Sequence, residues 1–337
     1  MLSRFALGIP RLVSPVSIRF IQTSSQKAAR FGGNTSGGFK FAENSGFGVR
    51  AGPTLKERLL GPTTGKPFIY GTYALAGSAA FGIGLLAYYG LATKDNSIIQ
   101  NSTLWPNYVK ERISSSYAYL AGSLAVTAAS GVAASRNPTI MRFTAGGGFL
   151  ALMGTMAAVV GTGMLCRSIN YEQGLVKHAA WLLHCGTLGA VLAPLCMLGG
   201  PVLVRAAWYT AGLISGLSAI AITAPSEKFL LMSGPLAMGL GVVFVANIGT
   251  FFLPPGSALG ASLASIVMYG GLILFSAFLM YDTQRLVKKA ELHPINSHMY
   301  GLPTYDPINA QLGLYMDIIN IFIRMAMIMS GSSNRRK

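Results

Sequence analysis

The sequence predicts an all-α fold, a polytopic membrane helix bundle of about eight transmembrane helices. Of its 337 residues, 52% are hydrophobic and only 11% are charged, which leaves more apolar surface than a soluble domain can bury. Six stretches without Asp, Glu, Lys or Arg each reach the roughly 20 residues that a helix needs to cross the hydrocarbon layer. The 41 glycines agree with this class, because small residues let membrane helices pack closely.

The charge-free stretches define the expected helices in chain order. They cover 67–93, 113–135, 143–166, 178–204, 206–226 and 229–281. The last stretch is long enough for two crossings, and we expect it to break at Leu253-Pro254-Pro255-Gly256 because proline cannot continue a helix. A weaker apolar segment at 309–330 completes the eight. Arg205 is expected to cap the turn between the fourth and fifth helices.

The beginning of the chain differs from the rest in charge. Before position 51, seven basic residues face one acid, Glu43, in a segment rich in Ser and Gly that lacks a continuous apolar core. This profile is typical of a mitochondrial presequence, with a merely disordered basic tail as the alternative. We therefore expect residues 1–60 to be a presequence and disordered matrix segment, and residues 61–337 to be a helical transmembrane domain of the mitochondrial inner membrane.

The net charge of +16 is spread over tails and loops. A charge distributed in this way does not predict a nucleic-acid partner. The lipid bilayer is the expected partner instead. The chain contains no Ser/His/Asp set, HExxH motif, Walker loop or dinucleotide fingerprint, so neither an enzyme nor a bound cofactor is expected.

Two of the ten acidic residues, Asp282 and Asp317, lie at membrane depth. A carboxylate at the centre of a membrane helix costs roughly 2.5 to 3.5 kcal/mol, so each needs a partner, water or a proton. We expect the seventh helix to end near Leu292, before Pro294, and the eighth to begin at Asp306-Pro307, an N-cap followed by proline. Each aspartate then lies ten residues, or about 15 Å, from the loop that joins the two helices.

The two aspartates would therefore be level in an antiparallel helix pair. If they face each other they form a dicarboxylate site, and the pair is expected to hold a proton near neutral pH because two adjacent carboxylates do not easily both ionise. The same oxygens suit calcium, which takes six to eight oxygen ligands, so protons and calcium would compete for them. The alternative for Asp282 is a solvated position near a helix end.

Two further polar residues are candidates for a supporting role. Arg324 follows Asp317 by seven residues and shares its helix face, so it either supports the site or forms an intrahelical ion pair with Asp317. His184, within WLLHC, either relays protons or is a neutral histidine bonded to a neighbouring helix.

Several segments resemble the transmembrane Bax-inhibitor-motif family, and in particular its mitochondrial branch. FLMYDTQ at 278–284 and LYMDIINIFIR at 314–324 resemble the last two helix signatures of that family. The likeness extends over about residues 66–337 through further matching segments, which are WPNYVKERI, YLAGS, APSEKFL, FLPPG, YDPIN and the long run at 177–212.

The resemblance implies a seven-helix core, here with one extra N-terminal helix at 68–92, and a calcium leak or calcium/proton exchange activity built on two aspartates. These aspartates map onto Asp282 and Asp317. An arginine that latches onto the pair in bacterial relatives maps onto Arg167. The acidic residue found in the same helix of some relatives has no counterpart here, because 143–166 contains no Asp or Glu.

Two functions of different classes follow. The first is cation transport across the inner membrane, with calcium and protons as the transported ions and no other cofactor. The second is a structural or adaptor role that maintains cristae and retains cytochrome c, with a part in apoptosis. For this role the resemblance implies cytochrome c and an inner-membrane AAA protease as partners. The glycine-rich helices also suit a homo-oligomer.

Overall fold

Helices account for nearly all of the chain that the computed structural model describes, namely residues 66–91, 105–146, 149–224, 227–253, 257–295, 299 and 301–333. The long helices are α2 (Lys66–Leu91), α4 (Asn107–Ser135), α6 (Phe149–Ser168), α7 (Gly174–Leu192), α8 (Gly200–Thr223), α9 (Ser233–Phe252), α11 (Gly271–Leu292) and α12 (Pro307–Ser333). The short elements are α5 (Pro138–Ala145), α10 (Ala258–Ser265), the 3-10 helices Ala193–Leu198 and Leu230–Met232, and the π-helical segment Ile266–Gly270. The predicted all-α class is confirmed.

Seven segments of the described chain are long and apolar enough to cross a membrane. They run from Asn107 to Ser135, Leu150 to Ser168, Gly174 to Leu198, Gly200 to Thr223, Leu230 to Phe252, Ala258 to Leu292 and Pro307 to Ser330. The predicted additional helix is present as α2, but it is not one of these seven, so its crossing stays a prediction. The chain is a multi-pass membrane protein. The predicted presequence, residues 1–60, lies outside the described residues.

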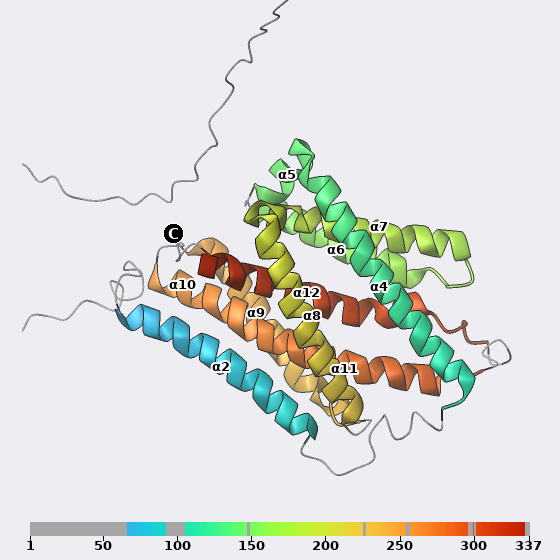
Figure 1. Cartoon of the computed structure of the whole chain (residues 1–337). Coiled ribbons are helices and arrows are strands. Elements are labelled where there is room, and N and C mark those ends of the chain that lie inside the picture. Colours follow the sequence, from blue (N-terminus) through green and yellow to red (C-terminus); the bar gives the residue numbers. More distant parts are fainter. Residues whose placement is uncertain are drawn as a thin grey trace, which may run out of the picture. The chain divides into compact units, whose positions relative to one another are not determined.

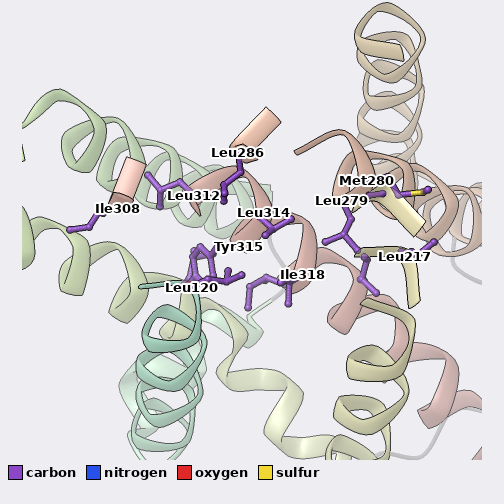
Figure 2. Packing of buried hydrophobic residues seen from close by; sticks show 14 of the residues in the cluster. Leu120, Leu217, Leu279, Met280, Leu286, Ile308, Leu312, Leu314, Tyr315 and Ile318 are labelled. Carbon is purple, nitrogen blue, oxygen red and sulfur yellow. The ribbon is translucent and has the colours of Figure 1, made fainter. Parts of the chain in front are cut away.

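The hairpin of α11 and α12 forms the centre of the bundle (Figure 1). Helix α12 packs against α11, α4 and α8, while α6 packs mainly against α7 at the outside. Half of the most apolar stretch of α12 is buried, compared with 6% of that of α6. Figure 2 shows the buried cluster to which both central helices contribute, including Leu312, Leu314 and Tyr315 of α12 and Leu279 and Leu286 of α11.

The predicted ends of the central hairpin are correct. Helix α11 ends at Leu292, and α12 begins at Pro307 after an N-cap in which Asp306 Oδ1 accepts a hydrogen bond from the Asn309 amide at 2.9 Å. The proline ring suits the first helical position, where no amide donor is needed, and the carboxylate satisfies one of the free amides of the first turn. We call the end of the bundle that carries the α11–α12 connection the hairpin end, and the other the opposite end.

Other predicted boundaries need correction. The helix expected at 178–204 ends earlier, because Gly199 adopts a left-handed φ of 92° and α8 begins at Gly200-Pro201. Arg205 therefore lies within the first turns of α8, where its Nε donates to the carbonyl of Pro201 at 3.2 Å, and it does not cap the turn. The Gly-Pro pair, and not the charged residue, therefore sets the boundary between these two helices.

The remaining differences concern helix starts and breaks. Helix α4 begins at Asn107 rather than 113, so three charged residues lie in its first turns. The short helix α5 precedes α6, where one helix was expected from 143. The break predicted near 253–256 is confirmed by the end of α9 at Phe252 and the start of α10 at Ala258, while residues 254–256 themselves lie outside the described chain.

Candidate functional site

The carboxyl groups of Asp282 and Asp317 meet between α11 and α12, within hydrogen-bonding reach of each other. Asp317 is 5% exposed and the Asp282 side chain 12% exposed, so neither points into bulk solvent. The helix ends predicted that the two aspartates lie at equal depth, but not that they face each other. In the structure the two helices are also rotated so that the aspartates face each other. Two carboxyls at this distance need a shared proton or a cation between them, because two bare negative charges would repel strongly at low dielectric.

The packing around the pair is close at Asp282 and leaves one oxygen of Asp317 without a donor among the described residues. Gly313 of α12 lies against the Asp282 carboxylate, and a Cβ at this glycine would overlap Asp282 Oδ2. Asp317 Oδ2 is buried and has no hydrogen-bond donor among the described residues. An orphaned buried carboxylate oxygen is costly, so this atom is suited to accept a proton or a cation.

A third charge at the pair, Arg285, was missed by the sequence prediction. Its Nη1 lies 3.6 Å from Asp282 Oδ1, one turn further along α11 toward the hairpin end, and its side chain is 64% exposed. The spacing of three residues on one helix was the available signal, because side chains at i and i+3 are neighbours. An ion pair exposed to this degree contributes little stability and opens easily.

The predicted latch arginine, Arg167, does not contact the aspartates. It is exposed at the end of α6, and no ion pair of the described residues includes it. Its backbone carbonyl accepts a hydrogen bond from Asn309 Nδ2 at 3.2 Å. The side chain borders a hollow of about 230 Å³ between α6, α7 and α12, which is also lined by His184 and Met316. The predicted latch contact is therefore absent from this structure.

Arg324 is buried but does not form the intrahelical ion pair with Asp317 that was one alternative. Its guanidinium turns toward α11 and donates to neutral oxygens of Val267 and Asn320. Arg324 and Asp317 do share a face of α12, as helix rotation predicted. The carbonyl of Val267 is nevertheless a closer partner for the guanidinium than the Asp317 carboxylate, which lies one or two turns away. A supporting role for Arg324 at the aspartate site stays a prediction.

His184 is buried in α7 and bonded to a neighbouring helix. Its Nδ1 lies 3.1 Å from Thr162 Oγ1 of α6, and its ring packs edge-on against Tyr315 of α12. This arrangement agrees with the simpler of the two alternatives, a structural histidine. A relay role stays a prediction.

The sequence prediction also missed a second buried charge centre, Lys177 and Asp306, at the hairpin end. Lys177 is 0% exposed, and its Nζ lies 2.7 Å from Asp306 Oδ2. The same ammonium donates to the carbonyls of Cys166 and Ile169 and to Asn309 Oδ1, so it joins the ends of α6, α7 and α12. Lys177 adjoins the charge-free run from 178 and so resembled an ordinary interfacial lysine.

Arg112 of α4 holds the other side of the hairpin end. Its guanidinium donates to the carbonyls of Ala290, His293 and Pro294, which follow or close the last turn of α11. These contacts satisfy carbonyls that have no partner within the helix. The ends of α11 and α12 are therefore each fixed by a basic side chain from another helix, and this sets the depth of both aspartates.

The two aspartates supply only part of a metal coordination shell. Among the described residues there is no cluster of three or more His, Cys, Asp or Glu side chains. Calcium takes six to eight oxygens, so two carboxyls that offer at most four need water or carbonyl oxygens to complete the shell.

Comparisons with known proteins place these features in a family. The family model described as "Inhibitor of apoptosis-promoting Bax1" matches residues 109–335, which include both aspartates. The Growth hormone-inducible transmembrane protein of Rattus norvegicus is 51% identical over 293 residues, covering 86% of this chain and 84% of the relative. Bax inhibitor 1 of Rattus norvegicus is 25% identical over 194 residues, which is 56% of this chain and 75% of the relative.

The likeness also reaches bacteria. An uncharacterized membrane protein of Vibrio cholerae is 27% identical over 176 residues, covering 50% of this chain and 68% of the relative. No solved structure shows a significant match. The resemblance read from the sequence segments is confirmed.

Proposed function

Because the chain belongs to the Inhibitor of apoptosis-promoting Bax1 family, and because its two membrane-depth aspartates meet, we propose that this membrane protein is a cation transporter. The proposed activity is pH-dependent exchange of calcium for protons, or a proton-gated calcium leak, through Asp282 and Asp317. The single observation that carries the proposal is the buried carboxyl pair with one oxygen, Asp317 Oδ2, that has no donor within the described chain.

The proposed cycle follows from the charge of the pair. With a proton shared between them, the carboxyls carry one negative charge in place of two and bind a divalent cation weakly. When that proton leaves, both groups are ionised and calcium can bridge them, since hard carboxylate oxygens are its usual ligands. Alternation between these two states couples calcium binding to proton release at one site.

The proposed location is the mitochondrial inner membrane. The support is the basic, Ser- and Gly-rich composition of the first 60 residues, which is typical of a mitochondrial presequence. Import of a fluorescent fusion of residues 1–60 into mitochondria tests it, and retention of that fusion in the cytosol would contradict it.

Reconstitution tests the transport proposal. The purified chain is placed in proteoliposomes with a calcium indicator inside, and an outward proton gradient is imposed. We expect calcium uptake by the native protein and none above lipid background by Asp317→Asn. Glu111→Gln is the matched control, because Glu111 is an exposed acid on α4. Equal uptake by the native protein and Asp317→Asn would refute the proposal.

The adaptor role makes a different prediction. A Cβ built on Gly212 or Gly216 of α8 would meet no atom of another described helix within 4 Å, so a face of this helix is open to a second membrane protein or another copy of the chain. Complementation of a deletion strain with Asp282→Asn/Asp317→Asn separates the two functions. Restored cristae without restored calcium handling would assign the adaptor role to other residues.

A further inference from the structure

A positive charge is buried in the same helix interface as the aspartates, toward the opposite end of the bundle. Arg324 is 8% exposed. Its guanidinium donates to the Val267 carbonyl at 3.2 Å, to the Asn320 carbonyl at 2.8 Å and to Asn320 Oδ1 at 3.1 Å, and it lies over the Phe275 ring at 4.5 Å. None of the ion pairs found in the described chain includes this arginine.

The helix opposite Arg324 is shaped to hold the guanidinium. A Cβ on Gly271 would overlap Arg324 Nε and Nη2, so the first residue of α11 must lack a side chain for the arginine to fit. The Val267 carbonyl belongs to the π-helical segment Ile266–Gly270 directly before it. Irregular helix turns of this kind often mark functional positions, because they reorient backbone groups toward a ligand or side chain.

The position of this arginine relative to the aspartates follows from the helix register. Asp282 of α11 lies against Gly313 of α12, and eleven residues away on each helix Gly271 lies against Arg324. The guanidinium is thus on the same interface as the carboxyl pair, and the seven residues from Asp317 to Arg324 correspond to about 10 Å along the helix. Arg324 stands between the pair and the opposite end.

The aspartate pair borders an exposed side chain in the other direction. Asp282 pairs with the exposed Arg285, which lies one turn nearer the hairpin end, so the pair lies closer to the exposed surface on that side. A cation that leaves the pair along the α11–α12 interface toward the opposite end approaches a fixed positive charge that pairs with no carboxylate in the described part of the chain. Fixed arginines exclude cations from membrane pores in this way.

We propose that Arg324 is the electrostatic barrier that closes the aspartate site toward the opposite end of the bundle. The proposal rests on the transport function proposed above and adds the side from which ions reach the site. Ions exchange with the aspartate pair from the hairpin end. For an ion to cross the membrane, the guanidinium must move away from its position between Gly271 and Phe275. No carboxylate of the described residues pairs with Arg324, and such a partner would cancel the field that repels cations.

Charge removal at this position tests the barrier. Proteoliposomes are loaded with calcium, the proton gradient is omitted, and calcium efflux is followed. Arg324→Gln is expected to raise efflux by about tenfold, because removal of one charge at about 10 Å from a divalent ion lowers its barrier substantially. Arg324→Lys is the matched control, which keeps the charge and should stay within about twofold of the native rate.

Further variants make each outcome decisive. Arg324→Gln/Asp317→Asn should return to lipid background if the leak passes through the aspartates. Equal leak from Arg324→Gln and Arg324→Lys would overturn the proposal, since packing rather than charge would then control the flux, and native efflux from Arg324→Gln would overturn it too. Asp317→Asn alone tells the two proposals apart: unchanged exchange in that variant refutes the transport function itself.

Folding is followed by thermal unfolding in detergent. Arg324→Met is the second neutral variant, because its unbranched apolar side chain fills part of the same space. Replacement of a buried unpaired charge by such a residue is expected to maintain or raise stability. Failure of both neutral variants to fold would therefore also overturn the proposal, because Arg324 would then be retained for stability.

Discussion

Two carboxylates, that of Asp306 at the N-cap of α12 and that of Asp317 within α12, are both largely buried but differ in what surrounds them. Asp306 Oδ2 pairs with Lys177 and its Oδ1 accepts from the Asn309 amide, so both oxygens have donors. Asp317 faces another carboxyl, and its Oδ2 has no donor in the described chain. Burial is therefore a poor indicator of function by itself. A satisfied carboxylate holds the helix ends together, whereas an unsatisfied one is available to a proton or an ion.

Breaking the ion pair of Lys177 and Asp306 should have the largest effect on stability. Lys177→Met leaves the Asp306 carboxylate buried without its cation, which we expect to destabilise the fold by about 3–5 kcal/mol. The measurement is the unfolding midpoint of the purified protein in detergent. In the double variant Lys177→Met/Asp306→Asn the uncompensated charge is gone and most of the loss should be recovered. If Lys177→Met unfolds at the native midpoint, the pair has no structural role.

Substitution at the aspartate pair should instead lower activity and leave stability unchanged or higher. Asp317→Asn is expected to lower calcium/proton exchange by about a hundredfold, because the amide cannot take up and release the proton. Its unfolding midpoint should equal or exceed the native one, since a costly carboxyl contact is removed. Both quantities come from one protein preparation. A lower unfolding midpoint together with a native exchange rate per folded molecule would show that Asp317 serves stability and not transport.

The glycine beside the pair allows a finer test. Gly313→Ala places a Cβ where the Asp282 carboxylate lies, so this carboxylate must shift from its position beside Asp317. A displacement of this size is expected to slow exchange by about tenfold without unfolding the bundle. Gly212→Ala is the control, because nothing lies within 4 Å of the added Cβ there. Equal exchange rates in the two variants would show that the close approach at Gly313 does not matter.

The smallest expected effect concerns pH at the hairpin end. Burial, and then the nearby Arg112, lower the pKa of His293, so the folded protein favours the neutral imidazole. The stability from this residue is then present above the ordinary histidine pKa of about 6.5 and is lost as pH falls through the lower folded pKa. The unfolding midpoint should fall between pH 7.5 and pH 5 by slightly more in the native protein than in His293→Gln, pH values chosen to bracket about 6.5. Identical profiles would contradict this contribution.

Prediction of the hairpin succeeded where local sequence controls structure. Pro294 ends one helix and Asp306-Pro307 begins the next, and helix geometry then places Asp282 and Asp317 at equal depth whatever surrounds them. The same local reasoning failed at Arg205, because a charge was taken as a boundary that Gly199 and Pro201 actually set. Backbone-restricting residues mark helix ends more reliably than charges do.

The sequence by itself determined the all-α membrane class, the family, and the two aspartates that no apolar segment could accommodate without a partner. Only the tertiary structure decided which groups those charges face. Arg324 turned to the Val267 carbonyl and not to Asp317, Arg285 and not Arg167 reached Asp282, and Lys177 became fully buried among three helix ends. Depth along a helix depends on residue counts alone, whereas the partner of a buried charge depends on the rotation and packing of neighbouring helices, which distant parts of the chain set together.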